Sequence, residues 1–127
     1  MSVETEPFLK PIRGAGDYKR ALRRAKYLMR VKDLSASEND ELQLLALSLQ
    51  DYEEKNFEHY EVTPNEVLES LVTDGRHTQR AVARGTGIAV STINEIVHGK
   101  RNINAKQAVA LADYFKLRVD AFLPRRA

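Results

Sequence analysis

The chain contains no cysteine, so it can form no disulfide framework, offers no thiolate nucleophile and has no Cys ligands for zinc. No apolar run approaches the roughly 20 residues that span a bilayer. The N-terminus also lacks the basic and then apolar layout of a secretory signal. These absences exclude several enzyme and metal-binding classes, and we expect a cytoplasmic protein with no membrane partner.

Motifs of the common enzyme classes are missing as well. The three histidines, His59, His77 and His98, do not have HExxH-type spacing, no phosphate loop is present, and no serine lies in a nucleophile elbow. The available ligands support no metal site. We therefore predict no catalytic residue, no cofactor and no enzymatic activity.

The composition is that of a folded globular protein, with 43% hydrophobic and 30% charged residues. At 127 residues the chain can bury one respectable core or two small ones. Residues 1–62 hold ten Lys or Arg against twelve Asp or Glu, a net charge of −2, whereas residues 63–127 hold ten against six, a net charge of +4. The C-terminal half is therefore the better match for a polyanionic partner.

The first 16 residues are punctuated by proline and glycine, which predicts an extended or mobile arm. A helix is then expected to begin at Asp17 as its N-cap and to run to about Val31. Its inward positions are Tyr18, Leu22, Ala25 and Met29. Its outer positions are all basic, namely Lys19, Arg20, Arg23, Arg24, Lys26 and Arg30.

A second helix is expected after a short turn, with Ser37 as N-cap and Asp40 in the capping-box position. Its apolar stripe comprises Leu42, Leu45, Leu49 and Tyr52, and is widened by Leu44 and Leu47 beyond what one packing surface needs. Residues 34–62 hold eight acidic side chains and a single lysine, so the hairpin pairs a basic helix with an acidic one. The aromatic segment 56–62 is the expected junction to the next part of the chain.

The C-terminal half reads as five short helices with no strand pattern. The first has a strong start signal, in which Thr63 is the N-cap, Pro64 follows it and Glu66 completes a capping box, and Gly75 is expected to end it. Its buried residues are Val67, Leu68, Leu71 and Val72. The expected bounds of the remaining elements are Thr78 to about Gly85, Ala89 or Val90 to Val97 before Gly99, a helix opened by Asn104 and Gln107 that buries Ala108, Leu111, Ala112 and Phe115, and a last turn from Val119 to Leu123.

Two of these helices meet the demands of a helix-turn-helix. Helices that cross closely at a tight turn need a small residue at the crossing and a turn residue that tolerates positive φ. Ala83 and Gly87 satisfy these demands at the required spacing, and three aliphatic residues anchor the second helix, namely Ile88, Ile93 and Ile96. The competing interpretation is a generic small helical bundle in which this spacing arises by accident.

The second of the paired helices also carries a family resemblance. The recognition helix and following loop of the Xre or Cro/CI repressor family are similar to Gly87-Ile88-Ala89-Val90-Ser91-Thr92-Ile93-Asn94-Glu95-Ile96-Val97-His98-Gly99-Lys100-Arg101-Asn102. The match covers about residues 63–123. It implies an all-α fold in which an N-terminal helical hairpin, residues 1–62, precedes a five-helix phage-repressor-like domain, residues 63–127, that binds a double-stranded DNA operator.

The resemblance implies DNA contacts at three places. The base edges would be reached by Val90, Ser91, Thr92 and Glu95, and the side toward the backbone by Asn94 and His98. Phosphate would be held at a helix N-terminus by Thr78 and Gln79, and by charge at Lys100 and Arg101. Arg80 and Arg84 either add further phosphate contacts or are solvated surface arginines.

Two positions depart from the family. Ala89 stands where a polar cap is common, so the recognition helix begins at either Ala89 or Val90. Val90 replaces a long polar side chain, and valine can pack on a thymine methyl group but cannot make a bidentate contact to guanine or adenine. Glu95 either accepts a hydrogen bond from cytosine N4 or pairs with a basic neighbour.

The N-terminal half carries a second resemblance, which is to a narrower family. Four segments ahead of the helix-turn-helix resemble, in their order, the HigA antitoxins that have an N-terminal helical extension. These segments are Asp17-Tyr18-Lys19-Arg20-Ala21-Leu22, Leu28-Met29, Asp40-Glu41-Leu42-Gln43-Leu44-Leu45 and Asp51-Tyr52-Glu53-Glu54. Segment 56–60 departs from the shorter His-Tyr-Pro-like stretch that this family often has. The resemblance implies a cognate HigB toxin of the RelE-like ribonuclease class, which the antitoxin neutralises while repressing their shared operon.

An RNA-cleaving toxin must be basic, and the second helix offers complementary charge. Its acidic face comprises Glu38, Asp40, Glu41, Asp51, Glu53 and Glu54. The same residues are equally well explained as the solvated face of an amphipathic helix.

One helix-turn-helix contacts little DNA, so we expect a homodimer on a palindromic operator. The dimer would form either through Leu44 and Leu47 or through the helix after Asn104 together with Phe122 and Leu123. The alternative function is a stand-alone repressor whose N-terminal hairpin serves dimerisation only.

Overall fold

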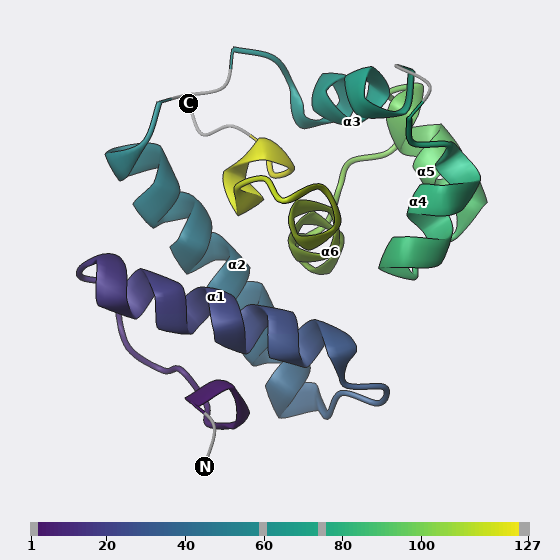
Figure 1. Ribbon diagram of the computed structural model, residues 1–127. Helices are drawn as coiled ribbons and strands as arrows, with labels where there is room; N and C mark the ends of the chain where they lie inside the picture. The colour runs from purple at the N-terminus through teal and green to yellow at the C-terminus, as the bar shows by residue number, and fades with distance from the viewer. Residues whose placement is uncertain (1–2, 59–60, 74–75, 125–127) are drawn as a thin grey trace.

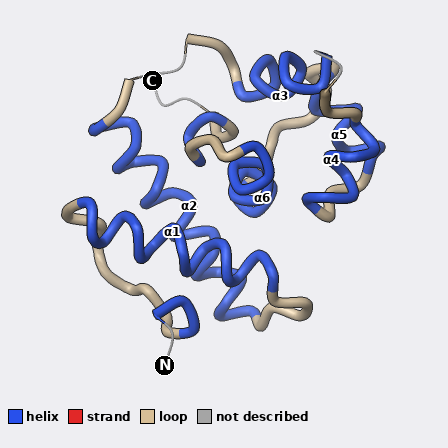
Figure 2. Tube along the Cα trace, viewed as in Figure 1, coloured by secondary structure: helices blue, strands red, loops and turns tan. Residues whose placement is uncertain are grey.

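A computed structural model of the chain describes residues 3–58, 61–73 and 76–124. Over these ranges the fold is all-helical and contains no strand (Figure 2), which confirms the predicted fold class. The elements in order are η1 Val3–Thr5, α1 Ala15–Arg30, α2 Ala36–Asn56, α3 Pro64–Thr73, α4 Gln79–Thr86, α5 Val90–Val97, α6 Ala105–Phe115 and η2 Val119–Ala121. No helix within these ranges is both long and apolar enough to cross a membrane.

The N-terminal hairpin packs directly on the C-terminal helices. α1 and α2 lie at one end of the molecule and α3, α4 and α5 at the other, with α6 and η2 between them (Figure 1). α6 contacts both hairpin helices as well as α4, and η2 contacts α2. One buried cluster runs from Leu28 and Leu42 in the hairpin to Leu68, Ile96 and Phe122 beyond it. Residues 1–62 and 63–127 therefore share a single hydrophobic core. The division of the chain into two parts with separate functions remains a proposal.

The start of α1 differs from the prediction. Gly14 is the N-cap, and Asp17 lies inside the first turn, where its carboxylate accepts a hydrogen bond of 3.1 Å from the Arg13 backbone N–H. This bond and those from two cationic side chains, Arg20 and Lys10, lower the pKa of Asp17 to about 2. Asp17 is therefore not the N-cap. It lies within the first turn of α1, and its side chain accepts a hydrogen bond from a residue just before the helix.

Arg24 is buried, so its assignment to the outer basic face was wrong. It is only 4% exposed, and its Nε and Nη2 atoms each donate a hydrogen bond of 2.8 Å to the buried carboxylate of Glu41. The N-terminal arm adds two bonds, from Phe8 N to Glu41 at 3.0 Å and from Arg24 Nη1 to the Glu4 carbonyl at 3.0 Å. Burial raises the pKa of Glu41, but the bonds from Arg24 and Phe8 outweigh burial and lower it. The arm, which contains η1, is therefore held against the hairpin.

The cap of α2 also differs from the prediction. Ser35, not Ser37, is the N-cap, and its hydroxyl accepts a bond of 3.1 Å from Glu38 N while Glu38 Oε1 accepts one of 3.0 Å from Ser35 N. Both serines precede an acidic residue by three positions, so spacing alone does not choose between them. The longer glutamate side chain suits the capping box better than the aspartate at position 40.

The apolar stripe of α2 divides into a buried part and an exposed part. Leu42, Leu45 and Leu49 are buried as predicted. Leu44 and Leu47 are 62% and 46% exposed, so the widening of the stripe faces solvent instead of the core.

Glu53 joins the hairpin to the C-terminal turn. It is fully buried, and its carboxylate accepts hydrogen bonds from the Tyr18 hydroxyl at 2.5 Å, Val119 N at 3.3 Å and Asp120 N at 2.9 Å. Burial raises the pKa of Glu53, and the bonds that favour its charged form do not fully offset this effect. The side chain thus satisfies the first backbone amides of η2 from a helix that lies more than 60 residues away in sequence.

The start signals of the C-terminal helices are confirmed. Thr63 and Glu66 form reciprocal bonds of 3.2 Å before α3, the Thr78 hydroxyl accepts a bond of 3.0 Å from Ala81 N, and a capping box opens α6 at Asn104. The predicted inward residues Ala108, Leu111 and Ala112 and the final Phe122 and Leu123 are buried. Gly75, the predicted end of α3, lies outside the described residues.

Candidate nucleic-acid interface

The turn between α4 and α5 has the geometry that a helix-turn-helix requires. Gly87 has φ of +77°, a left-handed conformation in which other residues are strained, and its N–H donates to the Ala83 carbonyl at 2.9 Å. Beneath α5 the aliphatic anchors Ile88, Ile93 and Ile96 are at most 8% exposed. The scaffold predicted from these five residues is confirmed.

The outer face of α5 is open. The helix begins at Val90, with Ala89 as an N-cap whose side chain accepts no hydrogen bond, so its first amides have no side-chain partner. Val90 is 48% exposed and Ser91 and Asn94 are exposed, whereas Thr92 is half-buried. This face carries the apolar and hydroxyl groups expected to meet base edges, and their contact with DNA remains a prediction.

One flank of α5 is tied to the N-terminus of α4. Asn94 Nδ2 donates a hydrogen bond of 3.3 Å to Gln79 Oε1. Thr78 uses its hydroxyl to cap α4, and Arg80 in the first turn is exposed. The expected phosphate-binding residues at this helix start therefore lie beside the recognition face, as the resemblance implied. In the free protein both side chains already accept hydrogen bonds, Thr78 from Ala81 N and Gln79 from Asn94.

His98 closes α5. Its Nδ1 atom lies 2.7 Å from the Asn94 carbonyl, so the ring folds back along the helix. A neutral His98 with the proton on Nδ1 would donate to that carbonyl and leave its other ring nitrogen for an outside partner.

Glu95 pairs with a basic neighbour. Arg101 Nη2 lies 3.4 Å from both carboxylate oxygens of Glu95, and the two side chains are 51% and 41% exposed. The free protein therefore realises the second of the two roles expected for Glu95. In a complex, Arg101 can hold a phosphate only by leaving or sharing this carboxylate.

A residue that sequence reasoning missed holds the far end of the recognition helix. Asn65 Nδ2 donates bonds of 2.8 Å to the Ile96 carbonyl and 2.9 Å to the Arg101 carbonyl, which fixes the C-terminus of α5 and the loop after it. Asn65 sits in the first turn of α3, and its local sequence signals only a helix start. No nearby residue could have indicated partners more than 30 positions away.

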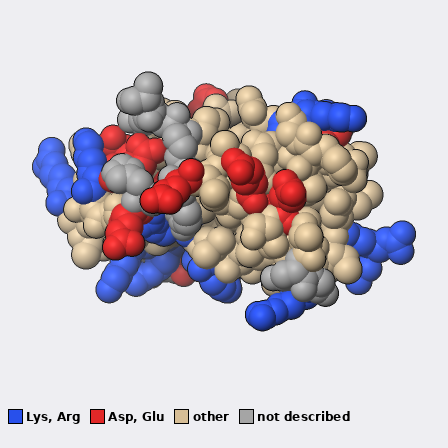
Figure 3. Space-filling model, turned by 90° about the horizontal axis from the view of Figure 1, so that it is seen from above, with Lys and Arg blue, Asp and Glu red and all other residues tan. Residues whose placement is uncertain are grey.

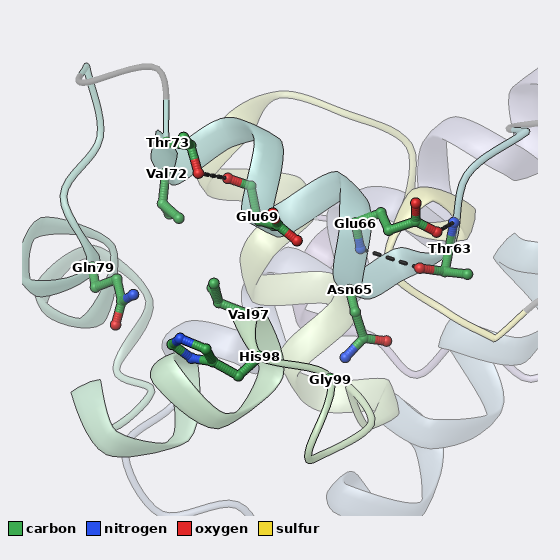
Figure 4. Close-up of a pocket in the computed structure, with 10 residues that line it drawn as sticks. All are labelled: Thr63, Asn65, Glu66, Glu69, Val72, Thr73, Gln79, Val97, His98 and Gly99. Atoms are coloured by element: carbon green, nitrogen blue, oxygen red, sulfur yellow. Dashed lines mark hydrogen bonds between the residues drawn. The ribbon is translucent and has the colours of Figure 1, made fainter.

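A groove between α3 and α5 lies beside this contact. Figure 4 shows Asn65 and Glu69 of α3 on the side toward Val97, His98 and Gly99, whereas Glu66 points to Thr63, whose N–H donates a hydrogen bond to it. The two carboxylates of the groove disfavour phosphate. Seen from the α3 side, the molecule has acidic side chains near the middle of its surface and basic ones mainly at the edges (Figure 3). We therefore do not expect this groove to face DNA, and the predicted DNA-facing surface remains α5 and its two flanks.

The six acidic residues of α2 do not form one surface, which corrects the expected toxin-binding face. Glu53 is fully buried, Glu41 is 7% exposed in its pair with Arg24, and Glu38 belongs to the capping box. The members that remain on the outer face are Asp40, Asp51 and Glu54. Helical spacing places Asp40 one turn before Leu44, and Asp51 and Glu54 one and two turns after Leu47, on the same side of α2.

Comparison with known families supports the helix-turn-helix. Residues 75–122 match the sequence model of the helix-turn-helix family, a stretch that contains α4, α5, α6 and η2. The chain therefore carries a helix-turn-helix domain in its C-terminal part, which indicates a DNA-binding transcriptional regulator. No curated protein and no solved structure matches the chain. In the described ranges, no three His, Asp or Glu side chains are grouped so as to hold a metal ion.

Proposed function

We propose that this chain is the antitoxin of a type II toxin–antitoxin pair. It binds a palindromic operator as a homodimer, represses its own operon, and neutralises a basic RelE/HigB-like ribonuclease toxin through its N-terminal hairpin. The observation that carries the DNA-binding part is the open face of α5, held from beneath by buried isoleucines and at its end by Asn65.

The outer face of α2 supports the second part of the proposal. Leu44 and Leu47 are exposed, and Asp40 precedes them and Asp51 and Glu54 follow them on the same side of the helix. Apolar side chains with acidic residues before and after them suit a basic protein partner, because burial of the leucines supplies affinity while the acidic residues steer the approach of positive charge. We call these five residues the α2 outer patch.

The DNA-binding part is tested with the double variant Ser91→Ala/Thr92→Ala. Loss of two hydroxyl groups that reach base edges should weaken binding to the DNA upstream of the gene about tenfold or more, while binding to the toxin is retained. Salt-dependent gel shifts measure the first effect and co-purification the second. A matched control, Ser37→Ala/Ser70→Ala, removes two exposed hydroxyls from α2 and α3 and should bind as wild type. Equal operator affinity in the Ser91 and Thr92 variant would contradict the assignment of the recognition helix.

A second candidate function rests on the same α2 outer patch. A stand-alone repressor would use Leu44 and Leu47 for dimerisation only, since a second copy of the chain can bury the same leucines. Truncation before α3 is a poor test, because α1 and α2 share their core with α6 and the fragment would expose that core. Surface substitutions keep the core intact.

The variant Leu44→Asp/Leu47→Asp separates the two functions. We expect it to lose co-purification with the basic protein encoded by the adjacent reading frame while it stays dimeric by light scattering. The control Asn39→Asp/Gln43→Asp adds the same charge to exposed positions of α2 without removing a leucine and should retain the partner. A monomeric leucine variant that still binds the partner would favour a dimer interface at this patch. Absence of any adjacent basic reading frame would remove the basis for an antitoxin.

A further inference from the structure

The C-terminal end of α1 lies beside the N-terminal end of α6. A cavity near the start of α1 is lined by Tyr18 and Leu22 together with Ala112 and Lys116 from the last part of α6. A second cavity is lined by Met29 from the last turn of α1 and by Asn104, Lys106 and Gln107 at the start of α6. The two helices therefore run antiparallel, and the end of α1 reaches the same edge of the molecule as the start of α6.

The same edge contains the start of the recognition helix. The cavity lined by Met29 is also lined by Gly87, Ala89 and Thr92. Thr92 and Asn94 project about 200° apart around α5, because successive residues turn by about 100°. Asn94 bonds to Gln79 of α4, so α4 flanks the recognition helix on one side and the end of α1 flanks it on the other.

Three basic residues lie close to this cavity in sequence or line it. Arg30 and Lys32 follow Met29 within three residues, Lys106 lines the cavity with Met29, and all three are exposed, the side chain of Arg30 to 73%. The Asp113 carboxylate is shared, with Arg30 at 3.8 Å, Lys26 at 3.7 Å and Lys116 at 3.5 Å. Asp33 in the turn after α1 is the other carboxylate close in sequence. Arg30, Lys32 and Lys106 thus stand against the carboxylates of Asp33 and Asp113, which leaves one net positive charge among these five side chains.

We propose that Arg30 and Lys32, at the C-terminal end of α1, contact the DNA backbone on the flank of the recognition helix opposite Thr78 and Gln79. The inference rests on the proposed operator binding and extends it to the N-terminal hairpin. A helix in the major groove has a phosphate backbone on either side, and each needs cationic or N–H partners. α4 supplies them on one side, and the end of α1 adds two charges beside the start of α6 on the other. The hairpin thus contributes directly to DNA affinity.

The salt dependence of DNA binding tests this inference, because each phosphate contact releases counterions. The variant Arg30→Gln/Lys32→Gln should bind both operator and random-sequence duplex more weakly. Its plot of log affinity against log salt concentration should be shallower than that of wild type by about two units. The charge-conserving variant Arg30→Lys/Lys32→Arg should restore the wild-type slope.

The matched control is Lys10→Gln/Lys55→Gln. Both lysines are exposed and each pairs with a carboxylate, but Lys10 lies near the opposite end of α1 and Lys55 at the far end of α2. This control should keep the wild-type slope. If the Arg30 and Lys32 variant binds duplex DNA with the affinity and the salt slope of wild type, the inference is overturned and the proposed function still stands. A wild-type protein that fails to bind duplex DNA would overturn both.

Discussion

Replacement of Glu53 by leucine is expected to lower the free energy of unfolding by at least about 3 kcal/mol. The leucine cannot accept hydrogen bonds, so it would leave the Tyr18 hydroxyl and the amides of Val119 and Asp120 without their acceptor in a buried site. Each buried donor left without a partner costs about 1–3 kcal/mol. Urea unfolding followed by circular dichroism measures the loss. The neighbouring Glu54→Leu, at a half-exposed position, should change stability by less than about 0.5 kcal/mol.

The effect of Glu53→Leu on the free energy of unfolding should also depend on pH. Burial raises the pKa of Glu53, so the folded protein holds this proton more tightly than the unfolded chain does. The stability that comes from this proton is present at low pH and is lost as pH rises through the raised pKa. Asp17, with its pKa lowered to about 2, acts in the opposite sense, and its contribution is lost as pH falls toward that value. The difference between wild type and Glu53→Leu should therefore shrink as pH rises, and a difference that grows would contradict the raised pKa.

Replacement of Arg24 alone should lower the free energy of unfolding by an amount similar to that expected for the loss of Glu53. Arg24→Met leaves the Glu41 carboxylate buried with only the Phe8 amide as a partner, and breaking a buried ion pair in this way costs about 3–5 kcal/mol. The double variant Arg24→Met/Glu41→Leu should recover most of that loss, because two apolar side chains can pack in place of the pair. A double-mutant cycle from urea unfolding measures the coupling.

The exposed Arg23→Met is the control for this pair, since it removes one positive charge from the adjacent position without leaving a buried carboxylate. It should change stability by less than about 0.5 kcal/mol. A double variant no more stable than Arg24→Met would show that the bonds from the N-terminal arm, and not the ion pair, dominate at this site.

The features that could be predicted from the sequence are those whose cause is local. A cap at Thr63, Thr78 or Asn104 needs only a partner three residues away. Gly87 marks the turn because its own backbone requires a positive φ, and the periodic isoleucines of α5 indicate its buried side. These signals sufficed for the helix-turn-helix and for the extent of α4, α5 and α6.

Local signals fail where two candidates share one pattern. Asp17 and Gly14 both precede a helical stripe, and Ser35 and Ser37 both precede an acidic residue at the capping distance. In each case the helix begins before the predicted N-cap. At α2 the choice depends on which serine side chain reaches a backbone amide, whereas Gly14 caps α1 with no side-chain bond, and spacing reveals neither start.

By itself, then, the sequence determined an all-helical chain with a helix-turn-helix and an amphipathic hairpin before it. Tertiary structure alone decided which charges of the hairpin are available to a partner. Arg24 and Glu41 are 17 residues apart, and Glu53 binds amides 66 and 67 residues away, so no pattern in either helix could show that these side chains are buried. The same long-range packing brought Met29, at the end of α1, to a cavity that Ala89 and Thr92 also line. It left Leu44 and Leu47 exposed, because the side of α2 that faces solvent depends on where α1, α6 and η2 pack.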